Sequence, residues 1–194
     1  MANQGRAQHY LSVAKRFIKH VVIKPLLVIL LFWVSSVASA DLTGTALIVD
    51  GDTIAISGNK IRLSGIDTPE KNQTCRKASV TWGCGYEATE TLRGWTYTKE
   101  VRCVGDTKDR YGRLIANCFV DGYNVNARLV YEGLALAYRK YSKQYVPEED
   151  KARSAKRGIW AGEFVAPWDW RRGERMKELR IGSAPCKGGC EPKD

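Results

Sequence analysis

The sequence predicts an α+β fold built around a small β-barrel. Short segments with alternating apolar residues, separated by turn signals, occupy residues 43–66, and a second pair occupies residues 101–120. One helical segment lies between these groups and two more follow them. Three meandering strands, a helix, two further strands and then helices are the order typical of a five-stranded barrel of the OB type with about three helices.

The first three strands are expected in one meander that ends at a proline. Asp50-Gly51 bends the first strand into the second, and Gly58-Asn59 suits the positive φ angles of a tight hairpin turn before the third. Pro69 stops the third strand because proline has no N–H to give to a sheet. The expected strands are residues 43–49, 53–57 and 61–66.

The rest of the barrel is expected after a first helix. A loop with Cys75 and Cys84 leads to this helix, and a later, shorter helix ends at Gly133, a residue suited to the left-handed position after a helix. The expected helices are residues 86–99, 124–131 and 147–156, and the two further strands are residues 101–104 and 114–120.

Residues 1–40 have the order of a secretory signal peptide. Basic residues without any acid precede an apolar run, PLLVILLFWV at residues 25–34, and small residues stand at Ala38 and Ala40. This order predicts export to the periplasm or the medium, with cleavage after Ala40 and no stable membrane association afterwards. An uncleaved membrane anchor is the alternative, but the apolar run is shorter than the roughly 18–20 residues that span a bilayer.

Removal of the leader changes both the charge and the available chemistry. The leader holds five of the 31 basic residues and none of the 21 acids, so residues 41–194 carry 26 basic against 21 acidic residues, a net charge of +5. This charge favours polyanions without being diagnostic. Both histidines, His9 and His20, lie in the leader, which excludes a histidine base and histidine-ligated zinc from the exported part.

The exported part divides into a barrel domain, residues 41–166, and a basic C-terminal extension, residues 167–194. The extension begins with PWDWRRGERMKELR, which fits a peripheral helix or a solvated charged arm, and we favour the arm. On that interpretation Arg171 and Arg172 face solvent and belong to no site. The length fits a single core, and we expect a monomer.

Six cysteines, all in the exported part, predict a disulfide framework. Two of them would face each other across the hairpin of the second strand pair, and the others bracket short loops. The expected disulfides are Cys75–Cys84, Cys103–Cys118 and, closing a small loop in the extension, Cys186–Cys190.

Acids and an arginine crowd the ends of the second and third strands. Asp52 begins the second strand and Asp67 follows the third, and these ends lie side by side in a meander. Two carboxylates that converge beside backbone carbonyls suit a hard cation such as Ca²⁺. Glu70 could hold a water as a base, and Arg62 could present a bidentate guanidinium to a phosphate. Arg113 lies in a glycine-containing hairpin loop that could swing toward the same spot.

Several motifs resemble the signature of a known family. DGDTI, IRLSGIDTPE and DRYGR, followed by VNARLVYEGLA and GIW, are similar to the staphylococcal-nuclease-like family (thermonucleases) over residues 43–160. The cysteine placement in WGCGYEA and ANC resembles its secreted bacterial branch. The resemblance implies an OB-fold, Ca²⁺-dependent phosphodiesterase that hydrolyses DNA and RNA with little sequence specificity and leaves 3′-phosphate ends.

The resemblance also implies a role for each motif residue. Single-stranded or locally melted DNA and RNA are the implied partners, because these groups address phosphate and a base face rather than base edges. The metal ligands would be the carboxylates of Asp52 and Asp67 and the backbone carbonyl of Thr68. The catalytic residues would be Arg62 and Arg113, on the scissile phosphate, and Glu70, the general base. The nucleotide pocket would contain Tyr111 and a second tyrosine, either Tyr138 or Tyr141.

Two alternatives stay open. An exported OB module that binds polyanions without cleaving them needs a basic groove, but it needs neither Glu70 nor the paired aspartates. The leader and the cysteine pattern also resemble a nuclease-like protein of succinoglycan biosynthesis, which would place the chain in exopolysaccharide production. Paired carboxylates also serve glycosidases, but the arginines beside them argue for phosphate.

Overall fold

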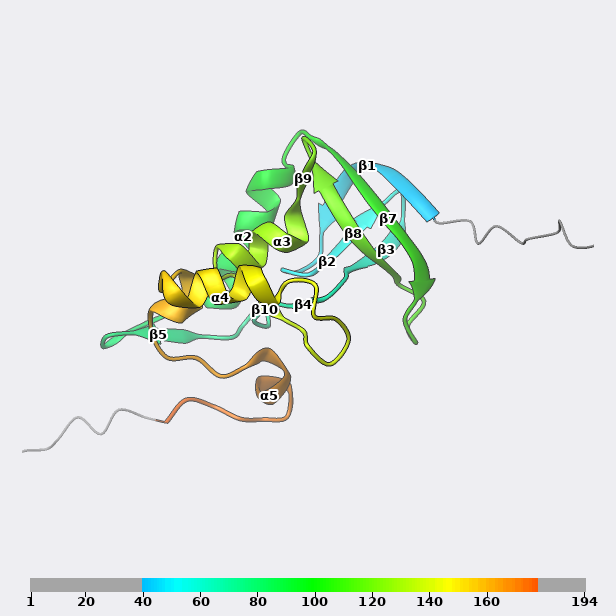
Figure 1. The fold of residues 1–194 in the computed structure, drawn as a ribbon. Helices are drawn as coiled ribbons and strands as arrows, with labels where there is room; N and C mark the ends of the chain where they lie inside the picture. Colours follow the sequence, from blue (N-terminus) through cyan, green and yellow to red (C-terminus); the bar gives the residue numbers. More distant parts are fainter. Residues whose placement is uncertain (1–39, 178–194) are drawn as a thin grey trace, which may run out of the picture. The chain divides into compact units, whose positions relative to one another are not determined.

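The structure, a computed structural model, describes residues 40–177. Five strands of this part close into a barrel (Figure 1). Antiparallel pairs run in the order β3-β2-β1-β7-β8, and a parallel pair between β3 and β8, with Ile61 opposite Leu114, completes the circle. The predicted α+β fold with a five-stranded barrel is confirmed. The barrel strands are β1 (Ala40–Ile48), β2 (Thr53–Ile56), β3 (Asn59–Leu63), β7 (Glu100–Lys108) and β8 (Leu114–Val120).

The tight turn between β2 and β3 lies one residue earlier than predicted. Positive φ angles occur at Ser57 (49°) and Gly58 (80°), whereas Asn59 already belongs to β3 and pairs with Ile56. Two successive residues with positive φ form the kind of two-residue hairpin turn that the sequence predicts, because its twist matches that of the strands.

The third predicted strand is divided into two. Gly65 has a φ of 72°, which suits glycine, and the chain turns there before β4 (Ile66–Asp67). After this turn β4 pairs with β10 (Leu136–Ala137), and Asp67 lies opposite Leu136. Asp67 therefore leaves the barrel sheet and belongs to a small two-stranded sheet beside it.

The three predicted helices are present, with their ends shifted by up to three residues. They are α2 (Cys84–Thr96), α3 (Val125–Tyr131) and α4 (Val146–Ser154). Asn124 caps α3, because its side-chain oxygen accepts from the backbone N–H of Ala127 at 3.0 Å.

Besides β10, five short elements were not among the predicted strands and helices. Most are too short to show a hydrophobic period, and their positions depend on partners elsewhere in the chain. They are β5 (Cys75–Lys77), β6 (Val80–Trp82), β9 (Tyr123–Asn124), the 3₁₀ helix η1 (Gly158–Ala161) and α5 (Pro167–Arg171).

The buried apolar side chains form two clusters. The larger one fills the barrel and includes Ile54 and Ile61 from the strands and Leu92 and Leu129 from α2 and α3. The smaller one lies outside the barrel and consists of Cys75, Cys84, Leu136 and Ile159, with Phe164, Ala166 and Trp168 packed against it. The second cluster thus holds the chain that leads into α5.

Two of the three predicted disulfides are confirmed. Cys103 and Cys118 face each other in the register of β7 and β8, and Cys75 joins β5 to Cys84 at the start of α2. The third predicted pair, Cys186–Cys190, lies outside the described residues, as does the predicted signal peptide apart from Ala40.

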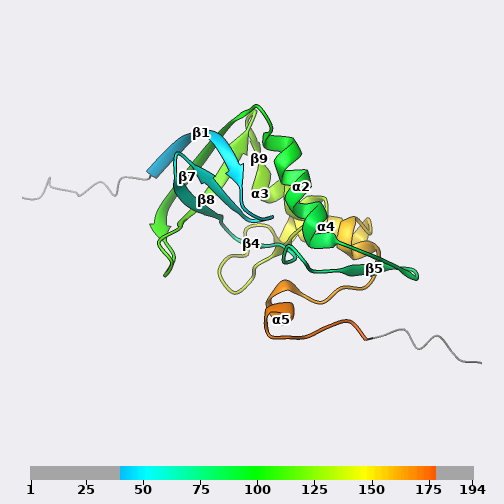
Figure 2. The same cartoon turned by 180° about the vertical axis from the view of Figure 1, so that it is seen from behind.

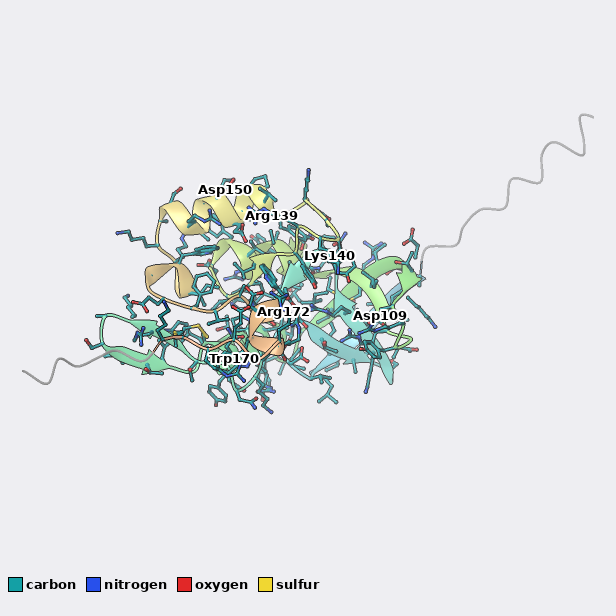
Figure 3. The ribbon with its side chains drawn as sticks, turned by 90° about the horizontal axis from the view of Figure 1, so that it is seen from below. Asp109, Arg139, Lys140, Asp150, Trp170 and Arg172 are labelled. Carbon is teal, nitrogen blue, oxygen red and sulfur yellow. A yellow bond between two sulfur atoms is a disulfide. The ribbon has the colours of Figure 1, made fainter. Side chains whose placement is uncertain are left out.

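We call residues 163–171, which end with α5, the C-terminal segment. Glu163 forms an isolated antiparallel bridge with Arg76 of β5, and the chain then continues to α5 below β4 and β5 (Figures 1 and 2). Seen from below, α5 lies between the β5–β6 hairpin and the barrel strands (Figure 3).

Two glycines fix the contact between the end of α3 and η1. A Cβ at Gly133 would lie 2.2 Å from the carbonyl oxygen of Arg157, and a Cβ at Gly158 would lie 2.2 Å from the carbonyl oxygen of Gly133. Both residues also have positive φ, 70° and 51°. Side chains are therefore excluded here by space and by backbone conformation alike.

Candidate functional site

Arg62 of β3 lies between two buried carboxylates. Its guanidinium forms ion pairs with Asp52, at the start of β2, and with Asp67, where Nη2 is 2.9 Å from Oδ1. The same guanidinium donates to the backbone carbonyls of Asp52 at 3.4 Å and Ile66 at 3.2 Å. The arginine and the two aspartates that the sequence places at neighbouring strand ends therefore meet in space.

Thr68, just after β4, also connects these strand ends. Its backbone N–H and its hydroxyl both donate to Oδ2 of Asp52 at 3.1 Å. A Cβ at Gly51 would lie 2.7 Å from the Thr68 hydroxyl oxygen, so a glycine there allows this close approach. Asp50 completes the turn, because its Oδ1 accepts the backbone N–H of Asp52 at 3.1 Å.

Burial acts on several charged groups of the site. Burial, together with repulsion from Asp52, raises the pKa of Asp50 to about 6. Burial also raises the pKa of Asp67, although the neighbouring arginines oppose the rise. For Arg62, burial works to lower the pKa, but attraction to Asp52 and Asp67 outweighs burial and raises it.

The donor set fits a hard cation. Among residues 40–177 no cluster of three or more His, Cys, Asp or Glu side chains is placed to hold a metal, but the predicted set needs two carboxylates and one backbone carbonyl. Carboxylate and carbonyl oxygens are the ligands that Ca²⁺ prefers, and both carboxylates are also ion-paired with Arg62 in this structure. The ligand roles of Asp52, Asp67 and Thr68 stay predictions.

Arg113, just after the tip of the β7–β8 hairpin, reaches the same strand end. Its Nε donates to Asp109 at 2.7 Å, and its Nη1 donates to the hydroxyl of Thr53 at 3.2 Å. Thr53 in turn donates to Oδ1 of Asp52 at 3.3 Å. Asp109, labelled in Figure 3, also accepts the backbone N–H of Arg113 at 3.0 Å, so the loop already holds this arginine beside β2.

The three predicted nucleotide-pocket tyrosines come from two segments of the chain. Tyr111 is exposed, and the guanidiniums of Arg110 and Arg113 lie 4.8 Å and 5.6 Å from its ring centre. Tyr138 and Tyr141 contact each other edge to face at 4.8 Å. The backbone N–H of Tyr138 donates to the carbonyl of Gly65, just before β4, at 2.9 Å. Both remaining candidates therefore belong to one aromatic group, and the choice between them stays open.

Glu70 is held by its backbone, and its side chain is partly exposed. Its N–H donates to the side-chain oxygen of the fully buried Gln73 at 3.1 Å, and its carbonyl accepts from the Gln73 N–H at 2.7 Å. A Cβ at Gly85 would lie 1.7 Å from the carbonyl oxygen of Glu70, so the start of α2 packs directly on this backbone.

Arg171 of α5 corrects one sequence interpretation. Its Nη2 lies 2.6 Å from Oδ2 of Asp67, and its Nη1 lies 2.6 Å from Oε1 of Glu70. Attraction to these carboxylates raises its pKa, although burial opposes the rise. The solvated-arm interpretation is therefore wrong for Arg171, whereas Arg172 is exposed, as predicted, and pairs locally with Asp169.

The sequence carried one signal for this contact that the charge pattern concealed. Two tryptophans, Trp168 and Trp170, flank Asp169 in α5, and a solvated arm has no use for large apolar rings. Trp168 stacks on Tyr138 with an interplanar angle of 6° and 5.7 Å between ring centres. The aromatic residues, more than the charges, marked the extension as packed.

Comparison with known proteins places most of the described chain in one group. Residues 60–162 match the family described as "Staphylococcal nuclease homologue". An uncharacterized endonuclease of Haemophilus influenzae is 35% identical over 137 residues, which cover 66% of this chain and 72% of that protein. The micrococcal nuclease of Shigella flexneri is 34% identical over 161 residues, 73% of this chain and 87% of that protein.

A relative with a different printed role is equally similar. The succinoglycan biosynthesis protein ExoI of Rhizobium meliloti is 34% identical over 127 residues, which cover 63% of this chain and 66% of that protein. The family match ends at residue 162, immediately before the C-terminal segment. Arg171 therefore lies outside the part of the chain that the family describes.

Proposed function

The chain belongs to the family of staphylococcal nuclease homologues, and we propose that it is a Ca²⁺-dependent nuclease that hydrolyses DNA and RNA with little sequence specificity. The observation that carries the proposal is the position of Arg62 between Asp52 and Asp67. A guanidinium and two aspartates at one strand end, with a second arginine and a glutamate nearby, are seldom required by structure alone. Hydrolysis of a phosphodiester requires groups of these kinds at one place.

Asp52, Asp67 and the backbone carbonyl of Thr68 would hold the ion. When bound, Ca²⁺ would supply positive charge against the phosphate oxygens. The chain's own residues perform the remaining work. Arg62 and Arg113 bind the non-bridging oxygens and stabilise the charge that develops on them as water attacks phosphorus.

Glu70 takes the proton from the attacking water. Its side chain is 41% exposed, so water has access to it, and its backbone is fixed on Gln73 and α2. The bond from phosphorus to the 5′ oxygen breaks, the 5′ oxygen leaves as a hydroxyl after it takes a proton from solvent water, and the phosphate stays on the 3′ side. The aromatic rings near β4 offer a base face to stack on, which favours single strands of any sequence.

We also propose that the protein is exported and acts as a monomer. Two disulfides in the described residues are typical of an oxidising compartment and support this location. Within residues 40–177 no helix is long and apolar enough to cross a bilayer. The similarity to ExoI favours exopolysaccharide production as a second biological role, which would use the same chemistry.

The test is degradation of single-stranded DNA and of RNA by the protein from residue 41 onward. We expect cleavage of both with Ca²⁺, loss of cleavage in EDTA, and 3′-phosphate ends on the products. Cleavage that continues unchanged in chelator would contradict the metal requirement. Binding of nucleic acid without cleavage under any ion would instead favour the polyanion-binding module.

A further inference from the structure

Arg171 joins two carboxylates that have separate predicted roles. Its Nη1 donates to Glu70 at 2.6 Å and to Oδ1 of Asp67 at 3.2 Å, and its Nη2 donates to Oδ2 of Asp67 at 2.6 Å. Exposed ion pairs contribute little to stability, but the pair between Arg171 and Asp67 is not of that kind, because Asp67 is fully buried. One guanidinium therefore holds the predicted metal ligand and the predicted base in a fixed relation.

These contacts use one edge of the guanidinium and leave another edge available. An arginine has five N–H donors in a planar fork, and Arg171 uses the Nη1–Nη2 edge. Within residues 40–177 its Nε–H has no hydrogen bond. The Nε–Nη2 edge suits an anion, since Arg102 binds the carboxylate of Asp41 with that edge at 3.0 Å and 2.7 Å. The Arg171 side chain is 39% exposed, which gives a phosphate access to it.

The C-terminal segment that carries Arg171 is firmly held. Glu163 and Arg76 exchange two backbone hydrogen bonds at 2.7 Å and 2.9 Å, and the buried Gln73 donates to the carbonyl of Val165 at 2.6 Å. Trp168 then stacks on Tyr138. Anchored before and within α5, the guanidinium is preorganised, and a substrate would not have to order it.

The charges of the site also favour binding of a phosphate by Arg171. Asp50, Asp52, Asp67 and Glu70 would repel a phosphodiester, and within residues 40–177 Arg62 is the barrel arginine that is ion-paired with them. Arg113, the other predicted arginine, is paired with Asp109. A second positive charge directly on Asp67 and Glu70 reduces this repulsion at the face that the substrate must approach.

We propose that Arg171 is a third arginine of the active site. It positions Glu70 and Asp67 through its Nη1–Nη2 edge and binds a substrate phosphate through its Nε–Nη2 edge. This role rests on the proposed nuclease function and extends it, because it assigns part of the site to a segment outside the family match.

The test compares Arg171→Gln and Arg171→Lys with Arg172→Gln, a matched control at the next position. Binding of a fluorescent oligothymidylate is measured in EDTA over a range of salt, and Ca²⁺ affinity, kcat, KM and Tm are measured separately. Arg171→Gln should bind the oligonucleotide more weakly, with a salt slope reduced by about 0.7, the value for one single-strand phosphate contact. Its kcat should fall by roughly tenfold or more.

The two comparison variants have distinct expected results. Arg171→Lys should keep the fold and part of the binding, but it should not recover kcat, because an ammonium group cannot hold two carboxylates and a phosphate in one plane. Arg172→Gln should stay within about twofold of the parent in every measurement, since its partners Asp169 and Glu174 are local. If Arg171→Gln does not fold, Arg171→Lys decides the question.

Three results would overturn the proposal. Parental binding and kcat with a lower Tm would make Arg171 a structural clamp alone. Tighter Ca²⁺ binding with faster turnover would make it an internal cation that blocks the site. A parent that neither binds nor cleaves nucleic acid would refute the proposed function, and this role with it, whereas an active parent matched by Arg171→Gln refutes only this role.

Discussion

The β2–β4 meander and the C-terminal segment both bring an arginine to Asp67, but from very different distances along the chain. Arg62 is five residues from Asp67, whereas Arg171 is 104 residues away. The first contact follows from a local strand pattern. The second depends on a segment that must fold back across the molecule, and although Trp168 and Trp170 mark this segment as packed, no local pattern identifies Asp67 as the partner of Arg171. One carboxylate thus joins a part of the site that can be read from sequence to a part that cannot.

The two regions also differ in what holds them. β2 and β3 belong to the closed barrel, β4 follows β3 directly, and Ile54, Ile61 and Ile66 of these strands lie in the large apolar cluster. The C-terminal segment depends on the small cluster around Cys75 and Cys84, on the bridge to Arg76 and on one aromatic stack. Substitutions in the barrel should therefore lower mainly the stability of the fold. Substitutions around the small cluster should lower catalysis as well.

The largest expected effect is on the barrel side, at Arg62. Arg62→Lys keeps the charge between Asp52 and Asp67 but loses the bidentate fork, so kcat should fall by about 10²–10³. Tm should remain near that of the parent. Steady-state kinetics and thermal melting check both, and a near-parental kcat would remove Arg62 from the catalytic residues.

Arg113→Lys should cost less, about 10² in kcat, the lower end of the range for a lost oxyanion donor. Its guanidinium lies 2.7 Å from Asp109 and is shared with Thr53, so part of its role is to hold the hairpin loop. The same kinetics apply. A loss confined to Tm would show that Arg113 only holds the loop.

Removing each disulfide separately tests the difference between the barrel and the C-terminal segment most directly. Cys103→Ser with Cys118→Ser and Cys75→Ser with Cys84→Ser should each destabilise the fold by about 3 kcal/mol or slightly less, from the loop lengths. Only the second pair should also lower kcat, several-fold, because Cys75 and Cys84 support the C-terminal segment. Denaturant unfolding and steady-state kinetics on both variants test this. Equal losses of kcat would show that the Cys75–Cys84 disulfide has no special link to catalysis.

The smallest effect is expected for Trp168→Ala. Loss of its stack on Tyr138 should loosen α5 and raise KM several-fold with little change in the melting of the barrel. Trp170→Ala is the matched control, because its ring contacts Arg175 at 3.8 Å and not Tyr138. Equal KM values for the two variants would argue against an aromatic role for Trp168.

Much of the barrel could be predicted because its signals are local. The strand at 114–120 alternates buried and partly buried side chains along its whole length, and its ends were predicted correctly. Asn124 and Gly133 bracket α3 for reasons of capping that do not depend on the rest of the fold. Asp52, Arg62 and Asp67 could be brought together from sequence because the β2–β3 hairpin sets Arg62 opposite Thr53, next to Asp52, and Asp67 follows Arg62 by five residues.

The remainder could not be predicted because it depends on tertiary partners. The β5–β6 hairpin has three residues in each strand, and its exposed Val80 gives no apolar period. The sequence around Gly65 looks like one uninterrupted strand, so it does not reveal the division into β3 and β4. Arg171 looked solvated because its partners, Asp67 and Glu70, are not near it in the chain. Charge alone does not distinguish an arginine that faces water from one that faces a distant carboxylate.

The paired glycines between α3 and η1 have a consequence for mutational scanning. A Cβ at Gly133 would collide with the backbone of Arg157 and a Cβ at Gly158 with the backbone of Gly133, so every substitution at either position should disturb the fold. A screen that scores only nuclease activity would rank them beside Arg62, although in the described part of the chain no hydrogen bond joins them to the carboxylates of the site. Neither position can compensate for a change at the other, since both sides of the contact are backbone. Protein abundance scored alongside activity would separate these two positions from the residues that bind phosphate.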